Sequence, residues 1–234
     1  SAVATRSVTL ETTVLGQKMA MPMLLAPVGS SRMFYPKGEE LAAREAGQAG
    51  LHYILSTLSG CRAEDVKAAT AGSAWYQLYL LGGRDVALGS IARARSLGYS
   101  ALVVTIDTPV AGLRERDVRA GVTQLLTRKL FTMAPYVPQF LSKPGWLLAN
   151  MADGGLMPFA NVRLPEGPMG YADVGAALEQ SMVSWADFAW IREAWGGPIV
   201  VKGVHTADDA RHALAEGAAA VVVSNHGGRQ LDTV

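Results

Sequence analysis

Residues 218–232 read AAAVVVSNHGGRQLD, and this stretch decides the fold. It begins as an unbroken apolar run, which is typical of a strand covered on both faces of a parallel sheet. It then breaks into Ser224, Asn225, His226, two glycines and Arg229. In parallel α/β folds, the C-terminal ends of the strands are where the chemistry takes place. We therefore expect His226 to act as a general base and Arg229 to bind a carboxylate with its guanidinium group.

A repeated unit extends this prediction along the chain. An Ala-rich amphipathic stretch that ends in glycine precedes a short apolar strand in LAAREAGQAG–LHYILS, IARARSLGYS–ALVVTID and ADDARHALAEG–AAAVVVS. Gly50, Gly98 and Gly217 occupy the place of a helix C-terminal cap. Alternating helices and buried strands predict a parallel sheet with right-handed crossovers. The expected fold is α/β, an incomplete (β/α)8 TIM barrel with about six of the eight strands that a closed barrel needs.

The boundaries of these elements follow from the same pattern. Strands are expected near 23–26, 52–56, 75–80, 101–106, 199–202 and 219–224. Helices are expected near 39–49, 62–70, 84–97, 184–195 and 206–216. Thr206 and Ser184 are the expected N-caps of two helices, because each is followed three residues later by Asp.

Composition narrows the class of protein. The 234 residues carry 21 basic and 20 acidic side chains, a balance that gives no reason to expect a nucleic-acid partner. A single cysteine, Cys61, excludes an intramolecular disulfide and suits a reducing compartment. The sequence contains no signal peptide and no apolar run of about 18 residues, so a cytoplasmic location is expected. The absence of an initiator Met and the end at Val234 suggest one barrel domain, residues 1–234, truncated at both ends.

Polar or conformationally special residues follow every expected strand. Taken singly, each has a structural explanation, since Ser and Thr cap helices and a buried tyrosine can satisfy its hydroxyl group. Together they gather amide, hydroxyl, guanidinium, ammonium and imidazole groups at one mouth, which favours a binding and catalytic site. These residues are Ala26, Pro27, Val28, Gly29, Ser56, Gln77, Tyr79, Thr105, Asp107, Arg114, Lys202 and Ser224.

A long insertion, residues 115–183, interrupts the repeat. Its segment LLTRKLFTMAPYVPQFLSKPGWLLANM is rich in Leu, Met, Pro and aromatic residues and also carries basic side chains. A connection of this length inside an α/β domain is usually functional or mobile. Three interpretations stay open: a lid over the site, a contact between subunits, or a loop that rests on a membrane surface.

At this point the sequence resembles a known family, the FMN-dependent α-hydroxy-acid oxidases and dehydrogenases. The resemblance rests on VKGVHTADDARHALAEGAAAVVVSNHGGRQLD, LLAPVG, LSTLSGC, WYQLYLL, VTIDTPVAGLRERD and SWADFAWIREAWGGPIVVKGV. It covers nearly the whole chain except the centre of the insertion. It implies a (β/α)8 barrel that holds FMN at the C-terminal ends of its strands and oxidises a 2-hydroxy acid to the 2-keto acid.

The resemblance also implies roles for individual residues. His226 matches the base that takes a proton from the substrate, and Asp107 matches the acidic partner that orients this histidine. Arg114 and Arg229 match the guanidinium groups that hold the substrate carboxylate. Tyr79 matches a tyrosine whose hydroxyl lies near the substrate. Hydride transfer and prior formation of a carbanion both remain open as routes.

The implied cofactor contacts form a second group. Lys202 matches the lysine beside flavin N1 and the C2 oxygen, where a positive charge stabilises the reduced anionic ring. The family segments that hold the FMN phosphate, and a second substrate tyrosine, lie beyond Val234 and before Ser1. The remaining implied flavin contacts are Ala26, Pro27, Val28, Gly29, Ser56, Gln77, Thr105 and Ser224.

The electron acceptor and the partners are the least determined features. The position of Gly29 is often Ala in the family's oxidases and Gly in several of its dehydrogenases. With APVG, LSTLSGC and PGW, it makes the chain most similar to the quinone-linked L-lactate dehydrogenases. We expect a lactate-like substrate, a quinone acceptor, contact with the inner face of the cell membrane and a homotetramer. The alternatives are an oxygen-using 2-hydroxy-acid oxidase, another FMN-binding or phosphate-binding barrel, and a binding protein without catalysis.

Overall fold

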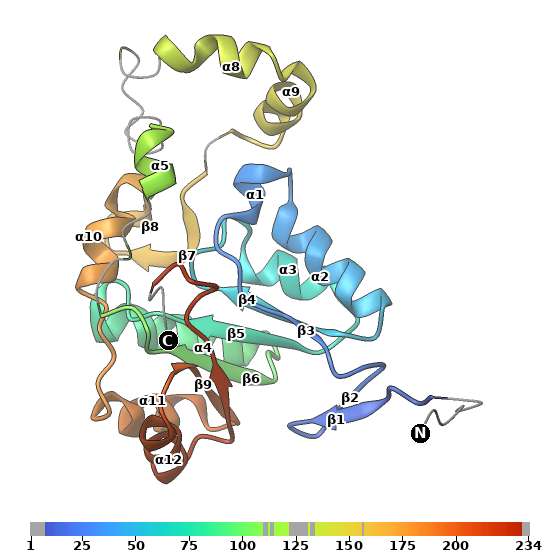
Figure 1. Cartoon of the computed structure of the whole chain (residues 1–234), viewed down its shortest axis with the longest axis vertical. Coiled ribbons are helices and arrows are strands. Elements are labelled where there is room, and N and C mark those ends of the chain that lie inside the picture. The colour runs from blue at the N-terminus through green and yellow to red at the C-terminus, as the bar shows by residue number, and fades with distance from the viewer. Residues whose placement is uncertain are drawn as a thin grey trace, which may run out of the picture.

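A parallel six-stranded sheet forms the centre of the molecule. The computed structural model describes residues 8–109, 112, 115–121, 131, 134–155 and 157–230. The strand order across the sheet is β10-β9-β6-β5-β4-β3, and all neighbouring pairs are parallel (Figure 1). Each strand falls where the apolar runs predicted it, so the α/β prediction is confirmed. The strands are β3 (Leu24–Leu25), β4 (His52–Ser56), β5 (Ala74–Leu78), β6 (Ala101–Thr105), β9 (Ile199–Val204) and β10 (Ala220–Val223).

Helices alternate with these strands, as the repeated unit predicted. Gly50, Gly98 and Gly217 each follow a helix with φ of 68°, 77° and 90°, so the predicted C-terminal caps are confirmed. The helices between strands are α2 (Gly38–Gln48), α3 (Ala63–Ala69), α4 (Gly83–Ser96), α11 (Asp187–Trp195) and α12 (Ala207–Ala215).

The two predicted N-caps differ in outcome. Thr206 Oγ1 accepts a hydrogen bond from Asp209 N at 3.0 Å and donates one to the Asp209 carboxylate at 2.7 Å, which confirms the cap of α12. Ser184 was the wrong residue for α11, because that helix begins at Asp187 with Ala186 at its N-cap. The Ser184–Asp187 pair still forms, with the carboxylate accepting from Ser184 N at 2.8 Å.

Alternate side chains of the strands enter two separate apolar clusters. Tyr76, Leu102 and Val201 belong to the larger cluster, which they share with the surrounding helices. Trp75 and Val103 point to the opposite, inner face of the sheet. This alternation is the one that a barrel wall requires, with one set of side chains facing the helices and the other filling the interior.

A two-stranded hairpin closes one end of the inner face. It consists of β1 (Thr12–Val14) and β2 (Gln17–Met19), and Val14 and Leu15 pack against the inner cluster. Ala20 N donates to Gly50 O at 3.0 Å, just before β4, so the hairpin lies near the N-terminal ends of the strands (Figure 1). The C-terminal ends are therefore the accessible mouth of the sheet.

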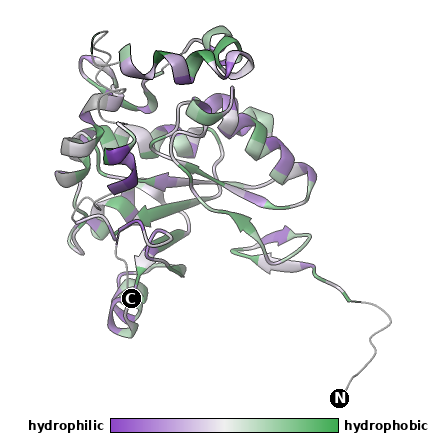
Figure 2. Ribbon diagram, turned by 45° about the horizontal axis from the view of Figure 1, so that its top comes forward, coloured by the Kyte–Doolittle hydropathy of each residue, from purple (hydrophilic) through white to green (hydrophobic). Residues whose placement is uncertain are grey.

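The insertion folds into two parts with different surroundings. One part is core, because Phe159 and Tyr171 are buried in a cluster with Tyr79 and Leu81. The other part, α8 (Val137–Leu141) and α9 (Pro144–Ala152), projects away from the sheet and contains apolar residues (Figures 1 and 2). The described elements of the insertion are α5 (Glu115–Arg119), η1 (Ala134–Tyr136), α8 (Val137–Leu141), α9 (Pro144–Ala152), β7 (Phe159–Leu164), β8 (Gly167–Met169), η2 (Tyr171–Asp173) and α10 (Val174–Glu179).

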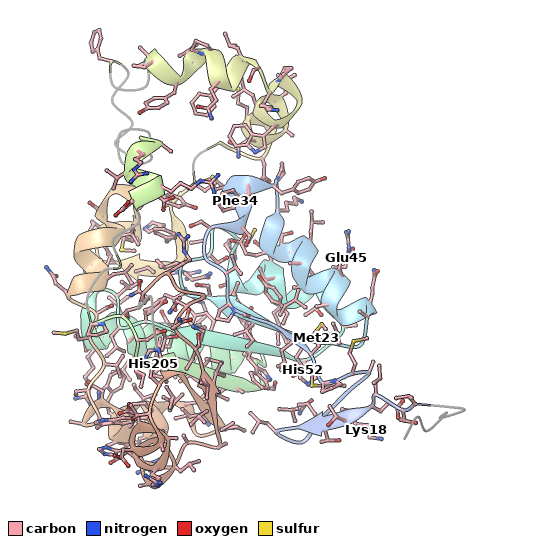
Figure 3. All side chains as sticks on the ribbon, in the orientation of Figure 1. Lys18, Met23, Phe34, Glu45, His52 and His205 are labelled. Atoms are coloured by element: carbon pink, nitrogen blue, oxygen red, sulfur yellow. The ribbon has the colours of Figure 1, made fainter. Side chains whose placement is uncertain are left out.

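Specific polar contacts attach α9 to α1 (Ser31–Phe34). Arg32 Nε donates to the Asp153 carboxylate at 2.6 Å, and Arg32 Nη2 donates to Asp153 O at 2.6 Å. Trp146 Nε1 donates to Phe34 O at 2.9 Å, and Phe34 lies on the corner below α9 (Figure 3). These contacts hold the projecting helices in a defined place relative to the sheet.

Candidate active site

Three side chains form a hydrogen-bonded chain at the C-terminal mouth of the sheet. His226 Nδ1 lies 2.6 Å from Asp107 Oδ2, and His226 Nε2 lies 3.1 Å from the Tyr79 hydroxyl oxygen. The three residues follow β6, β10 and β5, so residues far apart in the sequence meet where the strands end. The Asp107 side chain is fully buried, whereas 22% of the His226 side chain is exposed. The imidazole is therefore held from the protein side and open toward the mouth.

This arrangement assigns different tasks to the two ring nitrogens. A carboxylate accepts hydrogen bonds, so the contact with Asp107 assigns the proton of the neutral ring to Nδ1 of His226. The lone pair of Nε2 then faces the Tyr79 hydroxyl, which donates to it. Asp107 also stabilises the imidazolium that forms when Nε2 takes a proton. The chemistry that these three residues can perform is general-base catalysis.

The backbone of His226 is itself unusual. Its φ is +60°, a left-handed conformation that is uncommon for residues other than glycine and clusters at functional sites. Ser224 Oγ accepts a hydrogen bond from His226 N at 3.1 Å, and Asn225 Oδ1 accepts one from Gly228 N at 3.1 Å. Ser224, predicted as a flavin contact, thus also supports the turn that carries His226.

Lys202 is the main electrostatic feature of the mouth. It lies in β9 opposite Thr105 and Val222, only 6% of the residue is exposed, and Nζ has no hydrogen-bond partner among the described residues. Desolvation by burial lowers the pKa of Lys202, and the nearby charge of Asp107 opposes this effect. A buried ammonium without a partner is unfavourable unless an electron-rich group binds beside it. The site therefore fits a ligand with an anionic or carbonyl-like edge near Lys202.

A row of buried polar side chains crosses the ends of three neighbouring strands. Gln77 Nε2 donates to Thr105 Oγ1 at 2.9 Å, and Gln77 Oε1 accepts from Ser56 Oγ and from Thr57 N, both at 3.2 Å. The structure thus brings together Ser56, Gln77 and Thr105, three of the predicted cofactor contacts. Because each supports the next, the row is fixed before any ligand binds.

The segment after β3 lies beside this row. A methyl group on Gly29 would lie 3.3 Å from Leu58 Cβ and 3.9 Å from Ser56 Oγ. Ser30 N donates to Leu58 O at 2.8 Å, which ties the segment to the end of β4. Pro27 and Gly29 are half-buried, and Ala26 and Val28 are exposed.

Of the two predicted carboxylate-binding arginines, only Arg229 is described, and its side chain pairs with α5. Arg229 Nη2 lies 3.6 Å from Asp117 Oδ2 of α5, and about half of the Arg229 side chain is exposed. Arg229 follows His226 by three residues in the sequence. Its side chain points toward α5 and not toward the His226 imidazole. Arg114 lies outside the described residues.

One residue of the mouth was missed by the sequence analysis. Gln230 Nε2 donates to Asp107 O at 3.3 Å, and Gln230 Oε1 accepts from Gly112 N at 3.3 Å. Gln230 therefore connects the His226 turn to the segment that carries Asp107. The sequence signal that could have identified Gln230 was its position directly after Arg229 in SNHGGRQLD.

The described part of the chain contains neither a metal-binding cluster nor a membrane-spanning helix. None of the described His, Cys, Asp and Glu residues form a group of three or more that could hold a metal ion. No helix in the described part of the chain is long and apolar enough to cross a membrane.

Comparison with protein families identifies relatives of this chain. Residues 2–234 match the family model described as FMN-dependent dehydrogenase. The L-lactate dehydrogenase of Pectobacterium atrosepticum is 40% identical over 231 residues, which cover 96% of this chain and 58% of that protein. The L-lactate dehydrogenase of Stenotrophomonas maltophilia (strain K279a) is 40% identical over 232 residues, covering 96% of this chain and 59% of that protein.

Solved structures are similar over the same span. The monotopic membrane protein (S)-mandelate dehydrogenase matches with a TM-score of 0.84 and 34% identity, covering 97% of this chain and 60% of the other. Mandelate oxidase with (S)-2-phenylpropionate matches with a TM-score of 0.72 and 33% identity, covering 97% of this chain and 54% of the other. The chain thus spans little more than half the length of the relatives and structures it matches.

Proposed function

The chain belongs to the FMN-dependent dehydrogenase family, and from this premise we propose that the full-length protein oxidises a small L-2-hydroxy acid, such as L-lactate, to the 2-keto acid. The single observation that carries the proposal is the Asp107–His226–Tyr79 chain at the strand ends. A base oriented in this way is what the removal of a substrate proton needs. Relatives named L-lactate dehydrogenase, at 40% identity, support the substrate class.

The residues of the mouth fit FMN as the cofactor. The buried ammonium of Lys202, which has no hydrogen-bond partner in the described part of the chain, suits the electron-rich edge of an isoalloxazine ring. The row formed by Ser56, Gln77 and Thr105 offers fixed donors and acceptors beside it. When bound, FMN supplies the acceptor for the two electrons that leave the substrate. The charge of Lys202 stabilises negative charge that develops next to it.

The proton is handled by residues of this chain. We assign the acceptance of a substrate proton to His226 Nε2, while Asp107 holds the opposite nitrogen at 2.6 Å and stabilises the imidazolium. The Tyr79 hydroxyl occupies the position in front of Nε2, so the substrate hydroxyl takes over this place or shares it. The substrate is thereby oriented before the proton moves.

The substrate carboxylate is assigned to Arg229 and Arg114. A guanidinium group binds a carboxylate through two parallel hydrogen bonds, which an ammonium group does not reproduce. The contact of Arg229 with Asp117 is a half-exposed pair at 3.6 Å, and such pairs contribute little to stability. Turning the Arg229 side chain toward the mouth therefore costs little.

We further assign a membrane quinone as the electron acceptor and residues 115–183 as the segment that contacts the membrane. The projecting helices and the end of α1, residues Phe34 and Tyr35, expose large apolar side chains. Lys143 lies between α8 and α9. The solved structure with a TM-score of 0.84 is named a monotopic membrane protein, which supports a peripheral membrane location. The inner face of the cell membrane is part of our proposal. The exposed side chains are Phe34, Tyr35, Phe131, Val137, Leu141, Leu148 and Met151. A homotetramer is part of the same proposal and is tested by light scattering.

Anaerobic mixing of the full-length flavoprotein with hydroxy acids tests the activity. L-lactate is expected to bleach the flavin absorbance, with D-lactate as the control and (S)-mandelate and glycolate as competing substrates. His226→Ala is expected to slow the bleaching about 10²–10⁴-fold, the typical contribution of a general base, with FMN still bound. Near-normal bleaching by this variant would exclude the assigned role.

The same preparation separates the two classes of acceptor. The similarity to mandelate oxidase keeps oxygen as the second candidate. A dehydrogenase is expected to be reoxidised rapidly by a soluble quinone and slowly by air. Peroxide formation that equals substrate turnover in air, with no gain from added quinone, would identify an oxidase instead.

A further inference from the structure

Gly203 has a conformation and a place in the sheet that set it apart from its neighbours. Its φ is +99°, a left-handed value that favours glycine. The pairing of β10 with β9 passes from Val222–Lys202 to Val223–Val204, so Gly203 has no partner across this ladder. Bulges of this kind are frequent next to active sites, where they redirect side chains.

Asp107 lies directly on the bare backbone of this bulge. On the other side of β9, Thr105 pairs with Lys202, and Ile106 N donates to Lys202 O at 2.9 Å. The next residue after Ile106, Asp107, lies against the backbone of Gly203. A methyl group on Gly203 would lie 2.6 Å from both Cβ and Cγ of Asp107 and 2.9 Å from its backbone N. No ordinary side chain fits in this space without displacing Asp107.

A displaced Asp107 would lose its contact with the catalytic base. The carboxylate is fully buried, and its Oδ2 lies 2.6 Å from His226 Nδ1. Gln230 also holds Asp107, through the backbone carbonyl at 3.3 Å, so the residue has little room to move elsewhere. We propose that Gly203 is a positioning residue, whose missing side chain seats Asp107 so that it orients His226. This inference rests on the proposed oxidation of a hydroxy acid.

Backbone conformation alone is the competing explanation for this glycine. Gly98 supplies a matched control, because its φ is +77° and a methyl group there would meet no atom within 4 Å. Gly98→Ala therefore introduces the left-handed strain without the collision. Any effect of Gly203→Ala beyond that of Gly98→Ala reports the contact with Asp107.

The experiment compares Gly203→Ala, Gly98→Ala, Asp107→Ala and the Gly203→Ala/Asp107→Ala double variant in the full-length flavoprotein. Gly203→Ala is expected to lower the anaerobic rate of flavin reduction about 10²-fold, as a displacement of about 1 Å does, with KM and FMN content near those of the wild type. The double variant is expected to react no more slowly than Asp107→Ala alone, because the two changes remove the same interaction. A crystal structure of Gly203→Ala is expected to show the Asp107–His226 contact lengthened.

Each other outcome overturns the inference. An unchanged rate in Gly203→Ala, or equal loss in Gly98→Ala, assigns Gly203 a backbone role only. Additive losses in the double variant lead to the same assignment. If Gly203→Ala does not fold, the Gly203→Ala/Asp107→Gly variant, which removes both side-chain atoms from the collision and keeps the backbone N at 2.9 Å, is expected to yield more folded protein, and no gain over Gly203→Ala assigns the collision to the backbone alone. A wild-type flavoprotein that no hydroxy acid bleaches refutes the proposed function instead, so the two failures are distinguishable.

Discussion

At the scale of single residues, Lys202 is the side chain that most restricts what can bind. Its buried ammonium has no hydrogen-bond partner among the described residues, and burial lowers the pKa of Lys202. Such a group opposes folding of the protein without cofactor and favours the bound state. Stability and function therefore place opposite demands on this position.

Lys202→Met should show these opposite demands in one variant. Without FMN, the methionine variant is expected to be more stable than the wild type by about 1–3 kcal/mol, because an unpaired buried polar group has been removed. With FMN, flavin reduction by substrate is expected to fall, since negative charge on the ring is no longer stabilised. Urea unfolding of the cofactor-free protein and anaerobic stopped-flow measure the two effects. Lower stability of the cofactor-free variant would contradict this view of Lys202.

Burial of His52 predicts a pH dependence of the protein's stability that does not involve the active site. It lies at the start of β4, near the β1–β2 hairpin (Figure 3), and only 3% of it is exposed. Desolvation by burial lowers the pKa of His52 below its usual 6.5, although a hydrogen bond with the backbone of Gln17 opposes the shift. The unfolded chain then binds the proton more readily than the folded one.

Because the pKa of His52 is lower in the folded protein, the protein loses stability as the pH falls. The contribution of neutral His52 is fully present above pH 6.5 and is lost as the pH falls below 6.5 toward the folded pKa. His52→Gln is expected to remove this part of the decline below pH 6.5, as measured by thermal unfolding. His212→Gln, at a half-exposed histidine on α12, is the control and should keep the decline. Parallel pH profiles for wild type and His52→Gln would refute the prediction.

At the scale of elements, the sequence predicted those strands and helices whose apolar pattern is local. All six sheet strands and the five helices that were predicted between them fall close to their expected ranges. The β7–β8 hairpin was not predicted, because its burial depends on distant partners. Phe159, for example, is buried through contacts with Tyr171 and Tyr79, and its own neighbours in sequence carry no strand pattern of sufficient length.

Asn161 shows how this hairpin is fixed to the barrel. It is completely buried on β7, its Oδ1 accepts from Ala63 N at 2.9 Å, and its Nδ2 donates to Cys61 O at 3.0 Å. The side chain thus satisfies the first turn of α3 from a strand almost 100 residues later. No local sequence signal specifies such a contact.

Asn161→Ala should therefore destabilise the protein. The variant leaves the buried Ala63 N–H without its partner, and it removes one of the two donors to Cys61 O, which still accepts from Ser59 Oγ at 2.8 Å. We expect a decrease of about 1–3 kcal/mol in the free energy of unfolding, the cost of one unsatisfied buried group, measured by denaturant titration. Gln48→Ala, at an exposed position of α2, is the control and should stay within about 0.5 kcal/mol of the wild type. A similarly small change in Asn161→Ala would mean that the hairpin is held by apolar packing alone.

At the scale of the whole molecule, the candidate site was predicted in its composition but not in its geometry. The motif around His226 placed a base at the strand ends, and the family resemblance implied that Asp107 orients it. The structure has Asp107 2.6 Å from Nδ1 of His226 and adds the contact of Tyr79 with Nε2. The bare backbone at Gly203 escaped prediction, because a glycine in a strand has many structural causes. Arg229 was predicted from the motif, but the direction of its side chain was not. That direction depends on a contact with α5, an element of the insertion.

The projecting helices link the fold to the proposed location of the protein. Leu148 and Met151 are 67% and 64% exposed on α9, while Arg32 and Asp153 fix the end of this helix to the body of the molecule. An apolar surface held in a fixed place can enter a membrane interface without first ordering itself. The contribution of a large apolar side chain to such binding is about 1.5–3 kcal/mol when it is fully buried.

Leu148→Glu/Met151→Glu should consequently release the full-length protein from membranes. Two charges on this surface are expected to lower the fraction that floats with vesicles of anionic phospholipid at least tenfold, because one apolar side chain already accounts for about that factor. Flavin reduction by substrate should stay near the wild-type rate, since neither residue contacts the mouth. Leu214→Glu, at a 56% exposed position on α12, is the matched control and should leave flotation unchanged. Equal flotation of both variants would assign the α8–α9 surface to a contact between subunits or to a lid.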